Sequence, residues 1–155
     1  MGSMQPLCVS PEVVSAFANC IMAIGAVLIL VQIWQSKIQA RTNFEDNLNS
    51  EYRRIIHSLP AKALLGGDLT KQEMTGKIDE FLTYVDLCNE QTFLRQHKRV
   101  GRDTWRFWAD GMRSNLSRPA FKKAWETIKS NSPSDFQELR KLEMTDFNDD
   151  PADWA

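Results

Sequence analysis

The residues best suited to chemistry are cations and aromatic rings, which alternate in one segment of the chain. Between residues 95 and 123, nine Lys and Arg side chains stand against two acids, a net charge of +7. Cations hold phosphates and rings stack on bases, so this composition is typical of a site for single-stranded nucleic acid or nucleotides. The predicted ligand-binding residues are Arg95, Lys98, Arg99, Arg102, Arg106 and Arg113, with Phe93, Trp105, Phe107 and Trp108 as the interleaved rings.

Each of these features also has a structural explanation. Trp105 and Trp108 have the spacing of residues on the buried face of a helix. Cations from Arg95 to Arg99 suit the end of a helix, where they interact favourably with its dipole. Basic side chains next to a membrane also meet anionic lipid head groups. The sequence therefore leaves two interpretations open, a ligand site and a solvated basic face.

Residue patterns for catalysis or metal binding are missing. His57 and His97 have no nucleophile or metal ligand at a recognisable spacing, and there is no glycine-rich phosphate loop. The acids between residues 146 and 153 lack the glycine and terminal glutamate of a calcium loop. The three cysteines have no paired spacing. The sequence predicts no enzyme, no metal and no cofactor.

Residues 13–36 predict a transmembrane helix. No charged residue interrupts them, and the 22 residues from Val13 to Trp34 would span about 33 Å as a helix, the thickness of a bilayer core. A buried core helix is the alternative, but it rarely runs so long without a charged turn. Cations follow this segment and none precedes it, so we expect a single pass through the bacterial inner membrane, residues 1–12 outside and the C-terminal part in the cytoplasm.

The predicted span has one face of small and polar residues. Most of them follow one another at spacings of three or four residues or the sum of these, which places them on one stripe of a helix, and Asn19 lies beside that stripe. They are Ser15, Ala18, Asn19, Met22, Gly25 and Gln32. Polar side chains avoid lipid, so this face predicts contact with further copies of the helix or with a water-filled pore. A homo-oligomer is expected, for example a tetramer. The alternative is that Ser15 and Gln32 lie at the two membrane interfaces, where polarity costs little.

Residues 37–142 predict a cytoplasmic helical domain, so the fold class is all-α. The apolar helix is expected to continue as an amphipathic one until Pro60, and a short helical turn follows it. Thr70 and Glu73 have capping-box spacing and should open a helix that ends near Gly101. Asp103 should cap the next helix, and a further one should start at Pro119. Residues 143–155 mix acids with single aromatics and predict a disordered tail.

Three stretches resemble a family of small, single-span bacterial membrane proteins of unknown function. They are residues 81–94 (FLTYVDLCNEQTFL), 105–112 (WRFWADGM) and 124–126 (AWE). Proteins of this build include membrane effectors of bacterial anti-phage defence, and the chain is similar to effectors of the Hailong type. The resemblance implies an oligomeric ion channel whose cytoplasmic domain senses a short DNA oligomer made by a partner nucleotidyltransferase. The density of Arg and Lys from residue 95 to 123 departs from the family pattern.

Two functions follow as expectations. The first is a pore-forming defence effector gated by an oligonucleotide, with membrane lipids and further copies of itself as partners. The second is a non-conducting membrane-tethered adaptor, which would dimerise through its span and bind lipid head groups or an acidic protein.

Overall fold

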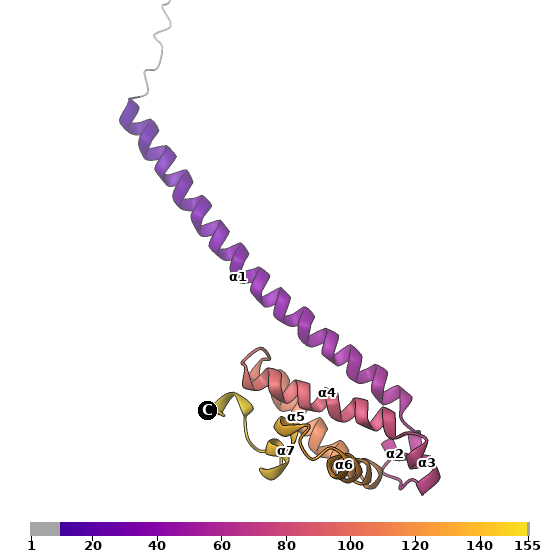
Figure 1. Cartoon of the computed structure of the whole chain (residues 1–155). Helices are drawn as coiled ribbons and strands as arrows, with labels where there is room; N and C mark the ends of the chain where they lie inside the picture. The colour runs from indigo at the N-terminus through magenta and orange to yellow at the C-terminus, as the bar shows by residue number, and fades with distance from the viewer. Residues whose placement is uncertain (1–9, 155) are drawn as a thin grey trace, which may run out of the picture. The chain divides into compact units, whose positions relative to one another are not determined.

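The computed structural model describes residues 10–154, except for the side chain of Ala18, and this part contains helices and no strand (Figure 1). The chain forms two compact units, which meet in sequence between Thr42 and Asn43. The prediction of an all-α chain with a long apolar N-terminal helix is confirmed. Of the predicted N-terminal segment 1–12, residues 1–9 lie outside the described part.

The first unit consists of the N-terminal part of α1, a single helix that runs from Pro11 to Ser58. Its large apolar side chains, Phe17, Ile21 and Leu28 among them, are exposed. The most apolar stretch of this helix is long enough to cross a membrane, and none of it is buried inside the chain. The first unit therefore holds one candidate membrane-spanning helix near the N-terminus.

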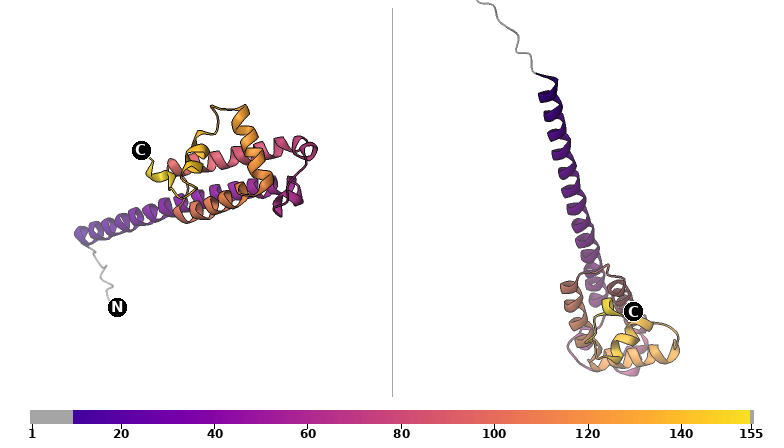
Figure 2. Two further views of the ribbon diagram at one scale, coloured as in Figure 1. Left: turned by 90° about the horizontal axis from the view of Figure 1, so that it is seen from below. Right: turned by 90° about the vertical axis from the view of Figure 1, so that its left-hand side faces the viewer.

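The second unit is a helical domain built around α4. Its further helices are α2 (Ala61–Leu64), α3 (Lys71–Thr75), α4 (Ile78–Gln96), α5 (Arg102–Leu116), α6 (Pro119–Asn131), α7 (Gln137–Met144) and the 3-10 helix η1 (Pro151–Asp153). Helix α4 packs against α6, α7 and η1, and Figure 2 shows the C-terminal residues beside it. The last turns of α1 add Leu48 and Ile55 to the same core, and Leu59, which follows the helix, joins them.

Aromatic rings fill the centre of this core. The Phe121 ring meets the rings of Phe81 and Tyr84 edge to face, with centroids 5.1 and 5.2 Å apart. Trp125, Trp105 and Trp108 are also buried, so the helical spacing of the tryptophans was a signal of the core. Leu82 of α4 points away from this core and is 40% exposed.

The helix boundaries differ from the prediction at three points. The capping box forms, since the Thr70 N–H donates to Glu73 Oε2 at 2.7 Å and the Glu73 N–H to Thr70 Oγ1 at 3.3 Å. It opens only α3, because Gly76 ends that helix and α4 starts afresh at Ile78. Helix α4 in turn ends at Gln96, before the left-handed Lys98, and Gly101 instead of Asp103 is the N-cap of α5.

The C-terminal segment folds, in contrast to the disordered tail that its composition predicts. Its last described residues include η1, in which Pro151 is buried, and Trp154 packs against the core. Arg95 forms an ion pair with Asp150, and the Lys141 ammonium lies 4.3 Å from the centroid of the Trp154 ring. Acids that look solvated in sequence are thus paired with cations from other helices.

Candidate functional site

The predicted oligomer face lies on the continuous helix α1. Ser15, Asn19, Met22 and Gln32 are exposed, and Gly25 is half-buried. A Cβ built on Gly25 meets nothing within 4 Å. The side chain of Ala18 lies outside the described part. Helical position places these residues on or beside one stripe of α1, and no other described segment of the first unit covers this stripe.

Four of the six predicted ligand-binding residues surround the turn between α4 and α5. Lys98, Arg99, Arg102 and Arg106 are all exposed, and none of them forms an ion pair within residues 10–154. We call them the turn cations. Arg102 and Arg106 stand one helical turn apart, where like charges repel each other. A bound anion would relieve this repulsion.

The turn that carries these cations is held from two sides. Lys98 adopts a left-handed conformation with φ of 58°, and Val100 is fully buried beneath it. Glu45 of α1 accepts the Gly101 N–H at 2.8 Å and the Thr104 hydroxyl at 2.6 Å. These bonds satisfy donors at the start of α5, so the turn cations are presented from a fixed backbone.

Two aromatic rings accompany the turn cations. Phe44 of α1 contacts one of them in space, and Phe107 of α5 follows Arg106 in sequence. The Arg99 guanidinium lies over the Phe44 ring, 5.0 Å from its centroid, in a cation–π contact. Phe107 is 76% exposed. Among the predicted stacking residues, Trp105 and Trp108 belong to the core, while Phe93 and Phe107 remain accessible.

Arg95 has a structural role in place of the predicted ligand-binding one. It is only 9% exposed. Its Nε and Nη2 donate to the two carboxylate oxygens of Asp150 at 2.7 and 2.6 Å, and its Nη1 donates to the Val100 carbonyl at 2.8 Å. The hydrogen bonds from Arg95 hold the pKa of Asp150 below its ordinary value. The same bonds raise the pKa of Arg95.

Arg113, the sixth predicted ligand-binding residue, also contacts the C-terminal segment. Its Nε donates to the Asp146 carbonyl at 2.9 Å, and its Nη2 contacts the side chain of Asn148. Arg113 is half-buried. The C-terminal segment thus occupies Arg95 and Arg113 and leaves the four turn cations open.

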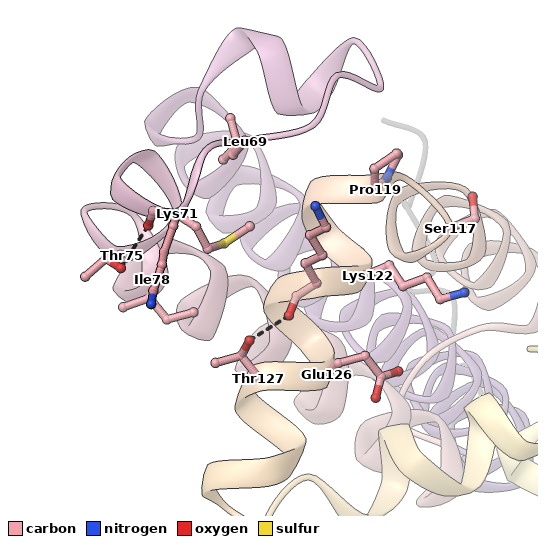
Figure 3. A pocket seen from close by; sticks show the side chains of 11 residues that line it. Leu69, Lys71, Thr75, Ile78, Ser117, Pro119, Lys122, Glu126 and Thr127 are labelled. Carbon is pink, nitrogen blue, oxygen red and sulfur yellow. Dashed lines mark hydrogen bonds between the residues drawn. The ribbon is translucent and has the colours of Figure 1, made fainter.

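Two further cations of the basic segment, Lys122 and Lys123, line a cavity of about 960 Å³ between α3 and α6 (Figure 3). Lys122 and Glu126 of α6 and Lys71 of α3 line this cavity, whose apolar wall includes Ile78. Lys123 also lines it and pairs with Asp68; its hydrogen bond lowers the pKa of this acid. The segment of net charge +7 is therefore divided between separate surfaces.

Glu45 and Asp150 are parts of the site that sequence reasoning missed. They are 56 and 55 residues away from the groups they bind. No local motif links an acid to a cation or an N–H at such a separation, so only the folded chain shows them.

Comparison with known proteins adds no homologue to these observations. Searches of protein-family models, curated proteins and solved structures find no match to the chain. In the described part of the chain, no group of three His, Cys, Asp or Glu side chains is placed to hold a metal ion. Function is therefore inferred from the residues themselves.

Proposed function

We propose that this chain is an effector of bacterial anti-phage defence, anchored in the inner membrane by α1. Copies of it associate through the face of α1 that carries Asn19 and Gln32, and together they enclose an ion-conducting pore. An oligonucleotide bound by the turn cations in the cytoplasm controls opening. The observation that carries the proposal is the exposure of an apolar helix with a polar stripe, in a chain that also displays four unpaired cations on a fixed turn.

Lipid is a poor environment for the stripe on α1. Asn19 and Gln32 carry amides that need hydrogen-bond partners, which lipid tails do not provide. Gly25 lets a second helix approach closely, because it has no side chain and nothing else fills its surroundings. Association of several copies satisfies the amides, and a ring of helices places them along a lumen.

The turn cations favour an oligonucleotide over a single small anion. They are four charges at one turn that form no ion pair in the described domain, so they match a row of phosphates. The exposed Phe107 ring offers a surface on which a base can stack. A bound oligonucleotide gates the pore by binding one conformation more tightly than the other.

Ion flux through liposomes tests the pore. We expect the full-length chain to conduct, and a short single-stranded DNA to change the flux. Replacing both amides (Asn19→Leu with Gln32→Leu) should lower the flux about tenfold, because each interhelical hydrogen bond contributes about 0.6 kcal/mol or more in every subunit. The conservative variant Ile21→Leu, outside the polar stripe, is the matched control and should conduct normally.

Absence of flux with and without DNA would contradict the pore. The particle mass in detergent then identifies the alternative, since a dimer cannot enclose a lumen. A dimer that binds vesicles containing anionic lipid would be the membrane-tethered adaptor, with its cations on lipid head groups.

A further inference from the structure

A second cavity, of about 320 Å³, lies inside the second unit between α1, α4 and α5. Four aromatic residues line it, together with the buried Cys88. They are Tyr52, Tyr84, Phe107 and Trp108. The volume is within the range of sites for small molecules, which are mostly apolar with a few polar groups.

Gln91 is the unusual residue of this cavity. It is 3% exposed and lines the cavity wall. Within residues 10–154, no group donates to or accepts from its side-chain amide. The neighbouring buried amide differs, since Asn115 Nδ2 donates to the Tyr84 hydroxyl at 3.0 Å and the Tyr52 hydroxyl at 3.3 Å. The Gln91 amide atoms are not fully buried, since Trp125 Nε1 is the one buried side-chain polar atom without a partner in the described part of the chain. The amide is therefore accessible from the cavity and offers a donor and an acceptor to a ligand.

Asn49 supplies a further donor. Its Oδ1 accepts the indole N–H of Trp108 at 2.8 Å. Because an indole nitrogen can only donate, this bond fixes which end of the Asn49 amide is the oxygen. The NH₂ group of Asn49 is then left for a molecule in the cavity.

The described lining of the cavity contains no cation, and its thiol and phenol groups stay protonated at physiological pH. Burial raises the pKa of the Cys88 thiol to about 12 and the pKa of Tyr84 well above its ordinary value. None of the described residues that line the cavity is Lys, Arg or His, and Asp110 is the one acid among them. A phosphate would therefore be excluded from this cavity, and an uncharged ligand favoured.

We infer that this cavity binds an uncharged heteroaromatic ring of the nucleobase type. Aromatic side chains stack on the faces of such rings, and Gln and Asn amides match the adjacent donors and acceptors on their edges. The base has two sources, a free nucleoside or one residue of an oligonucleotide. The inference goes beyond the proposed function, because it requires neither a pore nor the turn cations.

Gly111 makes a selective test feasible. It lines the cavity, and a Cβ built on it meets nothing within 4 Å. In Gly111→Leu the new side chain should therefore fill the cavity without a clash. Gly111→Ala is the matched control, since it removes the same helix-interior glycine but leaves most of the volume open.

Titration calorimetry on the full-length chain in detergent measures binding of adenosine, guanosine, cytidine and thymidine. At least one nucleoside should bind to the unmodified chain. Its affinity should be about tenfold lower for Gly111→Leu and for Gln91→Leu, and it should be unchanged for Gly111→Ala. Melting temperatures check folding. If Gly111→Leu does not fold, nucleoside binding by Gln91→Leu tests the inference in its place. The inference is overturned if no nucleoside binds and DNA binding is insensitive to both variants, or if nucleosides bind equally well to both.

A short single-stranded DNA identifies the source of the base. Weaker DNA binding by Gly111→Leu assigns the cavity to a base of the oligonucleotide. Nucleoside binding that is lost while DNA binding persists assigns it to a free nucleoside. Nucleoside binding should persist in the double variant Arg102→Glu with Arg106→Glu, which removes the cations of the proposed oligonucleotide site. Failure of the oligonucleotide proposal can therefore be distinguished from failure of this inference.

Discussion

The double variant Arg102→Glu with Arg106→Glu is expected to bind a short single-stranded DNA about a hundredfold more weakly than the unmodified chain at about 0.1 M salt. Both side chains are exposed and neither forms an ion pair in the described domain, so their charge is available to phosphates. Loss of two phosphate contacts should also reduce the slope of log K against log salt by about 1.4. Fluorescence anisotropy over a salt series measures both quantities.

A matched control separates a site from a general charge effect. Lys71→Glu with Lys122→Glu changes the net charge by the same amount, but these residues lie around the cavity of Figure 3. This variant should bind DNA almost as well as the unmodified chain. Equal weakening by both double variants would mean that the DNA responds only to net charge, and the turn would not be the site.

Asp150→Asn should destabilise docking of the C-terminal segment by about 2–3 kcal/mol. Asparagine keeps an acceptor for the Ala152 N–H, which Asp150 Oδ1 binds at 3.0 Å. The variant therefore removes the carboxylate that pairs with Arg95 and leaves a buried guanidinium without its counterion. Amide hydrogen exchange of residues 145–154 should accelerate about 30-fold or more. Asp153→Asn, at an exposed acid of the same 3-10 helix, should have little effect.

The same ion pair predicts a pH dependence. The hydrogen bonds from Arg95 lower the pKa of Asp150 in the folded chain. Its contribution to stability is therefore complete above the unfolded pKa of about 4 and is lost as the pH falls through the lower, folded value. The protection of the segment against hydrogen exchange, corrected for the slower intrinsic exchange in acid, should fall in acid in the unmodified chain, and this contribution should be missing from Asp150→Asn. Equal acid sensitivity of both chains would contradict the role given to the pair.

Local patterns predicted much of the fold. The long apolar helix, the capping box at Thr70 and the helix start at Pro119 each depend on residues within a few positions of one another. The buried face of α5 followed from the helical spacing of Trp105 and Trp108 in the same way. These features need no partner from far along the chain.

The candidate site was only partly predictable, because its parts depend on distant partners. Four of the six predicted cations are exposed together, but Arg95 is committed to Asp150, and Arg113 contacts the C-terminal segment. Each residue turns a helix by about 100°, so cations close in sequence separate in space. The composition of residues 143–155 predicted disorder for the same reason, since the cations that neutralise its acids lie on other helices.

One guanidinium joins the end of the chain to the turn between α4 and α5. Arg95 donates both to Asp150 and to the carbonyl of Val100, which is buried beneath the turn cations. The two segments are therefore thermodynamically linked. An anion bound by the turn cations should strengthen docking of the C-terminus, and docking should strengthen anion binding by the same free energy. The C-terminus is thus positioned to act as an internal allosteric effector of the turn cations.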